Sequence, residues 1–121
     1  MKIVITSKGT STENEVDQRF GRARYLIVID TDTSEVTSHD NEVNLNAAQG
    51  AGIQTAQNVA NLGVNAVITG HVGPNAFRTL SAAKIDVYTG ASGTVQETLF
   101  KFQGGEMSPV QSADVEGHWI I

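Results

Sequence analysis

The chain has 121 residues and a mass of 12.8 kDa, the size of a single domain, and its 40% hydrophobic content can build a core without a structural metal. It contains no cysteine, which excludes disulfides, zinc ribbons, thiol nucleophiles and iron–sulfur clusters held by protein thiolates. Its formal net charge of -5 and pI near 5.0 oppose non-specific binding to nucleic acid or to an anionic membrane.

The first half of the sequence predicts three strands. Residues 2–7 are short, apolar and β-branched, and predict the first strand. Their apolar run is shorter than the roughly 7–15 residues of a signal peptide, and no later run reaches the roughly 20 residues that span a bilayer, so we expect a cytoplasmic protein. After a polar loop at residues 8–18, residues 24–30 and 35–40 predict a hairpin. Polar residues at alternate positions mark its second strand as an edge strand.

The second half predicts helices that alternate with short buried strands. Small and apolar residues at helical spacing, Pro74 at a first helical position and Gly63 after a helix set most of the boundaries. In chain order we expect a loop at 41–46, helices at 47–62, 74–84 and 94–102, strands at 66–69 and 85–88, and a partly mobile tail at 103–121. The order β-β-β-α-β-α-β-α predicts an α/β domain at residues 1–102, with a mixed five-stranded sheet covered by helices.

A cationic segment at residues 19–24 stands out in this acidic chain, because it holds three of the eight basic residues. Guanidinium groups present fixed forks of N–H donors that suit anions, so the segment predicts a selective anion site. Its candidate binding residues are Arg19, Phe20, Gly21, Arg22 and Arg24. The alternative is that at least one arginine only pairs with the carboxylates at positions 13–17, and that the Phe20 ring fills the core.

The turn at residues 70–73 is a second candidate site, since it follows a predicted strand and precedes a predicted helix. Backbone N–H groups at a helix start suit an anion, and ligands of open α/β sheets bind outside the carboxyl ends of the strands. His71, Val72 and Gly73 are therefore candidate binding residues. Imidazole is also a reasonable copper ligand, which makes His71 a candidate metal ligand. A hydrogen bond from His71 to a bound group, or a histidine that only caps the turn, are the alternatives.

Other chemistries have weaker support. Residues 50–52 read Gly-x-Gly, but they follow a long loop and lack the next small residue of a dinucleotide fingerprint. The sequence has no phosphate-binding loop of the usual kind, no close histidine pair for zinc and no nucleophile elbow. Asp30, Asp40 and Asp86 at predicted strand ends could form the two-metal cluster of a hydrolase, although turn and cap roles fit them better. We expect a binding protein and not an enzyme.

Several segments together resemble the dinitrogenase iron–molybdenum cofactor biosynthesis family. They are RFGRA at residues 19–23 after a polar loop, Asn44 before the Gly-x-Gly helix start, and VITGHVGPNAF at 67–77, followed by a helix and IDVY at 85–88. The resemblance covers roughly residues 1–102 and implies a three-layer fold of the ribonuclease H-like class. Family members bind or carry preformed metal–sulfur cofactors. The most similar branch, from sulfate-reducing bacteria, holds a molybdenum–copper sulfide cluster without covalent attachment, which fits a chain without cysteine.

The resemblance implies non-covalent binding, and carriage or assembly, of an anionic metal–sulfide cluster of the molybdenum–copper type, or of another molybdenum- or iron-containing type. The loops after Ser7 and Thr69 would flank one crevice, because the family's first and fourth strands are parallel neighbours. The implied cofactor-binding residues are Arg19, Phe20, Gly21, Arg22, Arg24, Asn44, His71, Val72 and Gly73, with His71 as the candidate metal ligand.

The implied partners are the cluster and an unidentified cluster donor or recipient protein. We expect a monomer that contacts neither nucleic acid nor membrane. The alternative function is an adaptor or regulatory domain that binds a partner protein through the exposed hairpin edge or through residues 119–121.

Overall fold

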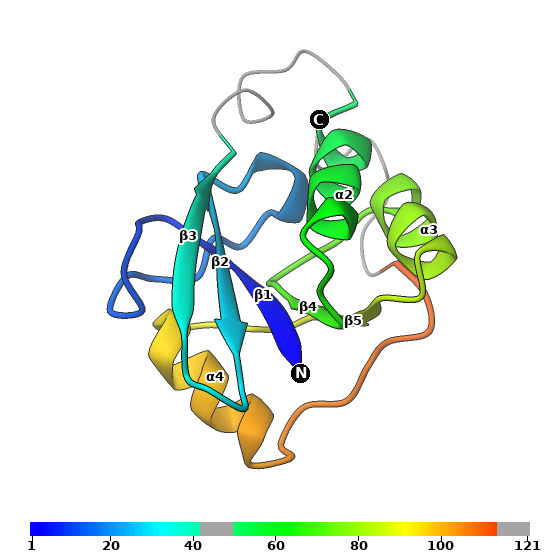
Figure 1. The fold of residues 1–121 in the computed structure, drawn as a ribbon. Coiled ribbons are helices and arrows are strands. Elements are labelled where there is room, and N and C mark those ends of the chain that lie inside the picture. Colours follow the sequence, from blue (N-terminus) through cyan, green and yellow to red (C-terminus); the bar gives the residue numbers. More distant parts are fainter. Residues whose placement is uncertain (42–49, 114–121) are drawn as a thin grey trace.

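The computed structural model describes residues 1–41 and 50–113; Asn44 and residues 119–121 lie outside them. The strands are β1 (Lys2–Ser7), β2 (Tyr25–Asp30), β3 (Val36–Asp40), β4 (Ala66–Ile68) and β5 (Asp86–Tyr88). They form the predicted mixed five-stranded sheet, in the order β3-β2-β1-β4-β5 (Figure 1). β1 is parallel to β4, and β4 is parallel to β5, whereas the β1–β2 and β2–β3 pairs are antiparallel.

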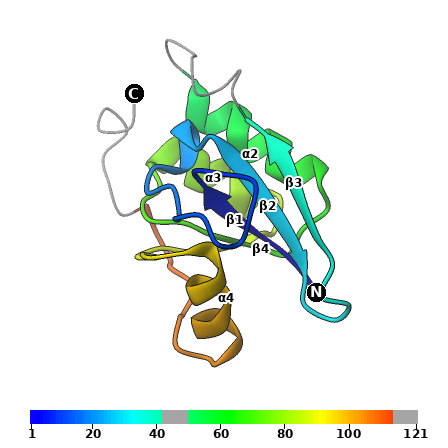
Figure 2. The ribbon, with the colours of Figure 1, turned by 90° about the vertical axis from the view of Figure 1, so that its left-hand side faces the viewer.

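Helices cover both faces of the sheet. α2 (Ala51–Asn61) and α3 (Pro74–Ala82) pack together over one face, and α4 (Val95–Gln103) lies over the other (Figures 1 and 2). A short 3-10 turn, η1 (Phe20–Arg22), lies against α2. The predicted α/β class is thus confirmed. Among the described residues, no helix has the length and apolar character that a membrane crossing requires.

β1 is the central strand, and its burial explains the two cores. Its side chains alternate between the faces, so Val4 packs under α2 and α3 while Ile3 and Ile5 pack under α4. In register, Val4 lies between Val28 of β2 and Val67 of β4. All three β1 side chains are fully buried, and each such burial contributes about 1.5–3 kcal/mol. A strand covered on both faces reads as a continuous apolar run, which is the pattern that predicted it.

Three helix boundaries differ from their predicted positions. α2 begins at Ala51 instead of residue 47, because its N-cap Gly50 has a left-handed φ of 78°; residues 47–49 lie outside the described residues. α3 ends at Ala82 instead of residue 84, because Lys84 has a left-handed φ of 61° that cannot continue a helix. α4 continues one residue past the predicted end and stops before Gly104. The predicted stop after α2 is confirmed, since Gly63 follows the helix with a φ of 70°.

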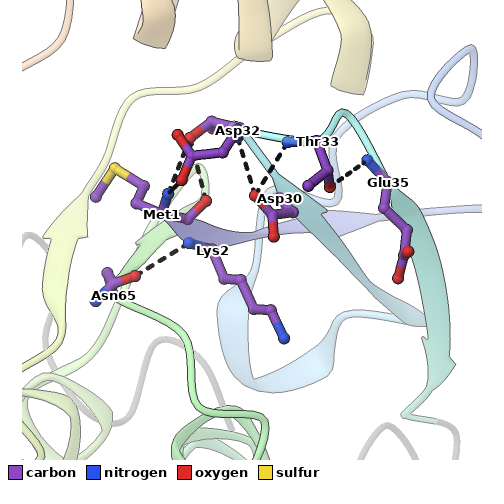
Figure 3. Close-up of polar contacts among 8 residues, drawn as sticks. Met1, Lys2, Asp30, Asp32, Thr33, Glu35 and Asn65 are labelled. Carbon is purple, nitrogen blue, oxygen red and sulfur yellow. Dashed lines mark hydrogen bonds and ion pairs between the residues drawn. The ribbon is translucent and has the colours of Figure 1, made fainter.

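The turn between β2 and β3 is held by carboxylates (Figure 3). The Asp30 carboxylate accepts the N–H of Asp32 at 2.9 Å and the N–H of Thr33 at 3.3 Å, as in an Asx-turn. These bonds, led by the one from Asp32, hold the pKa of Asp30 below its ordinary value. The amino group of Met1 forms an ion pair with Asp32 at 2.8 Å. Asp30 therefore has a structural role in this turn.

The two edge strands of the sheet have different surroundings. β3 is an edge strand, as predicted, and four of its five residues are exposed. At the β5 edge, the N–H of Val110 donates to the C=O of Val87 at 2.8 Å. Val110 packs against the core under α2 and α3, and Met107 packs against the core under α4. These contacts join residues 107–110, in the predicted tail, to the folded domain.

α4 begins with a capping box, in which two side chains satisfy two backbone donors. The Thr94 hydroxyl accepts the N–H of Glu97 at 3.0 Å, and the Glu97 carboxylate accepts the N–H of Thr94 at 2.9 Å. The N–H of Thr94 therefore favours the charged carboxylate and lowers the pKa of Glu97.

Removal of this cap should destabilise the domain in a pH-dependent way. Thr94→Ala is expected to lower the free energy of unfolding by about 1 kcal/mol at neutral pH. Because the pKa of folded Glu97 is lowered, its stabilisation is complete above the ordinary value of 4.5 and is lost as the pH falls through the lowered value. Urea unfolding across this acidic range should therefore show a shallower pH dependence for Glu97→Gln than for the unmodified chain. Equal slopes would contradict this role for Glu97.

Candidate functional site

The parallel strands β1, β4 and β5 end at the same side of the sheet, which we define as the carboxyl edge. The loops that follow them, residues 8–19, 69–73 and 89–94, meet at this edge. Ligands of open α/β sheets bind outside such an edge. Both segments singled out in the sequence, residues 19–24 and 70–73, lie here.

Backbone pairing joins these two segments directly. The N–H of His71 donates to the C=O of Gln18 at 2.8 Å, and the N–H of Phe20 donates to the C=O of His71 at 3.2 Å. Arg19 and His71 thereby form an isolated parallel β-bridge. The cationic segment and the histidine turn, which are far apart in the sequence, are therefore neighbours in the fold.

The third loop is tied to the same place. The N–H of Gly90 donates to the C=O of Gly70 at 2.9 Å. The side-chain amide of Gln18 donates to the C=O of Ala91 at 3.0 Å. A Cβ on Gly70 would lie 2.8 Å from the Cα of Gln18, so only glycine permits this approach. We refer to these contacts among Gln18, Gly70, His71, Gly90 and Ala91 as the loop lock.

Two buried threonines lie beneath the loop lock. The hydroxyls of Thr6, in β1, and Thr69, directly after β4, are 2.8 Å apart and fully buried. The Thr6 hydroxyl also donates to the C=O of Asp17 at 2.8 Å. Since buried hydroxyls require partners, this pair fixes the first loop to the ends of both strands.

The three arginines of the cationic segment have different surroundings. Arg19 is exposed, and Arg22 is half-buried. The Arg24 guanidinium forms an ion pair with Asp40 at 2.9 Å and lies over the Tyr25 ring, 4.7 Å from its centroid. The Arg24 side chain thus forms an ion pair with the end of β3, and its backbone N–H donates to Asp17, one of the carboxylates that the sequence suggested as partners.

Several predicted site residues are buried and support the segment from within. The side chains of Phe20 and Val72 are fully buried in the core under α2 and α3. A Cβ on Gly21 would lie 2.8 Å from the Cα of Gly52, so η1 packs directly on the first turn of α2. Phe20, Gly21 and Val72 therefore set the positions of the surface groups around them. Asn44 lies outside the described residues.

The starts of α2 and α3 face the same region. Both N-caps are glycines, Gly50 and Gly73, so neither helix has a side-chain cap, and neither has an acidic residue in its first turn. α4, by contrast, has its first N–H groups satisfied by Thr94 and Glu97. The first N–H groups of a helix carry partial positive charge, so α2 and α3 add to the positive potential of the arginines.

The two-metal hydrolase alternative is contradicted by the positions of its carboxylates. Asp30 is paired with Lys2, and Asp86 with Ala66, so both lie at the side of the sheet opposite the carboxyl edge. Asp40 lies at the carboxyl edge and is engaged by Arg24. In residues 1–41 and 50–113, no group of three or more histidine, cysteine or acidic residues could hold a metal ion.

Sequence inspection missed the residues that assemble this edge. Thr6 and Gln18 were not singled out, Asp17 was weighed only as an arginine partner and Gly70 only as part of its turn, yet their contacts hold the loops together. Each lies within a few residues of a strand end or a recognised segment, and only the parallel β1–β4 pairing makes them neighbours. Knowledge of that pairing is the signal that would have revealed them.

The loop lock should be sensitive to a single methyl group at position 70. Gly70→Ala places a Cβ against the Gln18 backbone, so we expect the free energy of unfolding to fall by roughly 1–3 kcal/mol. Gly104→Ala is the matched control, because its nearest neighbour is the Phe100 carbonyl oxygen at 3.3 Å and its φ of -79° suits alanine. Chemical denaturation of both variants tests this, and equal stability of Gly70→Ala and the unmodified chain would refute the close approach.

Comparisons with known proteins agree with this architecture. The chain is 35% identical to the orange protein of Desulfovibrio gigas, whose apo structure matches it with a TM-score of 0.92 over 94% of this chain and 96% of that one. A Thermotoga protein described as a candidate NifB protein is also 35% identical, with a TM-score of 0.83 over 96% and 98% of the two chains. An uncharacterized protein of Methanocaldococcus jannaschii is 28% identical over 96 residues, which are 78% of this chain and 81% of that protein.

The family model for the dinitrogenase iron-molybdenum cofactor matches residues 1–105, nearly the whole described domain. This match has the same extent as the sheet and its three helices. The chain therefore belongs to the dinitrogenase iron-molybdenum cofactor family.

Proposed function

We propose that this protein binds and carries an anionic metal–sulfide cluster at the carboxyl edge, without covalent attachment. Family membership and the likeness to the orange protein support a role in metal-cluster binding or carriage. The observation that carries the proposal is the bridge between Arg19 and His71, which sets the cationic segment beside the histidine turn.

The chemistry of the edge suits a cargo that brings its own sulfides. Such a cluster needs no protein thiolate, and this chain has no cysteine. It needs positive charge and N–H donors, which the guanidiniums of residues 19–24 and the starts of α2 and α3 supply. The side chains of Phe20 and Val72 are fully buried behind these groups and form an apolar wall that excludes water at the back of the edge.

The cargo we favour is a molybdenum–copper sulfide cluster, as the sequence resemblance implies, and other molybdenum- or iron-containing clusters are the alternative. His71 either coordinates copper through its imidazole or donates a hydrogen bond to a sulfide. The role is binding and not catalysis, and an unidentified protein donates or receives the cluster. We also infer a ribonuclease H-like classification, a monomer, and no contact with nucleic acid.

The adaptor alternative has one supporting observation, the exposed β3 edge. Residues 119–121, its other suggested contact, lie outside the described residues. An adaptor surface on β3 is compatible with cluster carriage, because four of the five residues of that strand are exposed.

Cluster loading tests the main proposal. The purified protein is incubated with tetrathiomolybdate and a copper(I) salt, desalted, and examined by visible absorption and by molybdenum and copper analysis. We expect a coloured species with a fixed metal ratio, and retention that falls as salt rises, because salt screens exposed charges. Arg22→Ala should reduce the retained metal about tenfold, as expected for one charge-assisted contact.

Arg78→Ala is the matched control, because Arg78 is an exposed arginine in the middle of α3 and away from residues 19–24. It should load as the unmodified chain does. Arg24→Ala should also lose metal, and its unfolding must be measured alongside, since Arg24 ties β2 to Asp40. Full retention in both Arg22→Ala and Arg24→Ala would refute the site, and a colourless, metal-free eluate from the unmodified chain would favour the adaptor alternative.

A further inference from the structure

Asp17 directly precedes the loop lock, and all four of its polar atoms are engaged. Its N–H donates to the C=O of Thr6 at 3.0 Å, and its C=O accepts the Thr6 hydroxyl at 2.8 Å. Its carboxylate accepts two further backbone donors, the N–H of Arg19 at Oδ1 and the N–H of Arg24 at Oδ2, each at 3.3 Å. The main chain of Asp17 is thus fixed to β1, while its side chain holds both ends of the cationic segment.

We propose that Asp17 is a positioning residue for cluster binding: its carboxylate closes residues 19–24 into one defined loop, and thereby sets where the guanidiniums point. This inference rests on the proposed function. Three cations within six positions repel one another, and a carboxylate at the base of the loop offsets part of that repulsion. Hydrogen bonds from backbone N–H groups to a carboxylate are also stronger than those between neutral groups.

The proposal has a signature that simple electrostatics cannot give. A carboxylate near an anion site repels the anion, so loss of the Asp17 charge alone would tighten binding. If Asp17 positions the segment, removal of its carboxylate frees both ends of the loop. Binding then weakens, because ordering the guanidiniums on binding costs conformational entropy. The two roles therefore predict changes of opposite sign.

Asp17→Asn and Asp17→Ala both remove the charge, but they remove different numbers of hydrogen-bond acceptors. Asparagine keeps one acceptor oxygen and replaces the other by an NH₂ group, which cannot accept an N–H. Alanine removes both acceptors. We expect the apparent Kd for tetrathiomolybdate with copper(I) to rise about tenfold in Asp17→Ala, and by less in Asp17→Asn, as expected for the loss of two and of one charge-assisted hydrogen bond.

Glu15→Gln is the matched control. Glu15 is an exposed carboxylate in the same loop, and it forms an ion pair with the Lys8 amine at 3.8 Å. The Glu15→Gln variant loses the same charge, so its apparent Kd for tetrathiomolybdate with copper(I) should be unchanged or slightly lower. Amide hydrogen exchange supplies a second readout without cargo: at least one of the Arg19 and Arg24 amides, the one that loses its acceptor, should exchange faster in Asp17→Asn, while the amides of β1 should not change.

Each outcome decides one point. A graded loss from the unmodified chain through Asp17→Asn to Asp17→Ala, with Glu15→Gln unaffected, supports the positioning role. Equal or tighter binding by Asp17→Asn overturns it. If the unmodified chain takes up no metal, the proposed function fails. The exchange experiment still tests the positioning role of Asp17, because unchanged exchange at both Arg19 and Arg24 would overturn that role independently. Should Asp17→Ala fail to fold, the isosteric Asp17→Asn carries both tests.

Discussion

The hydrogen bond from the N–H of His71 to the C=O of Gln18 joins the loop that follows β1 to the loop that follows β4. The parallel pairing of those strands brings the loops close, but this bond sets their register at the edge. The absence of a side chain at Gly70 allows the approach, and the Gln18 side chain extends it to the loop after β5. This contact therefore sets the cationic segment beside the histidine turn.

The cationic segment brings three arginines of a net acidic chain to the carboxyl edge, where the carboxylates of Asp17 and Asp40 also lie. The three arginines of residues 19–24 lie at the ends of the parallel strands, whereas Asp30 and Asp86 lie at the opposite side of the sheet. Helix starts with glycine N-caps add partial positive charge to the arginine side. The arginines can attract a small anion at short range, whereas the net charge of -5 repels a long polyanion.

Sequence reasoning recovered the fold because each element carried its own local signal. The buried runs at residues 2–7 and 66–69, the proline before α3 and the glycine after α2 each report a single element and need no partner. The order of elements then allowed few topologies. Residues 19–24 stood out by their composition and residues 70–73 by their place between a predicted strand and a predicted helix, and both signals are local.

The connections within the site could not be read in the same way. Thr6, Asp17 and Gln18 look like ordinary strand-end and loop residues, and their roles come from partners such as Thr69 and Ala91. Likewise, Asp40 was weighed as a metal ligand, whereas the antiparallel β2–β3 pairing delivers it to Arg24. Backbone hydrogen bonds between distant loops leave no compositional trace, because any residue other than proline can make them.

The loop lock also determines when in the life of the chain the site can exist. Its members come from residues 18, 70–71 and 90–91, so a growing polypeptide has no such surface until residues 90–91 have been synthesised. Contacts between segments this far apart in the sequence carry a loop-closure cost that local contacts do not. A cargo that needs the assembled edge can therefore bind only after residues 90–91 have joined the other two loops, so an empty form precedes a loaded one.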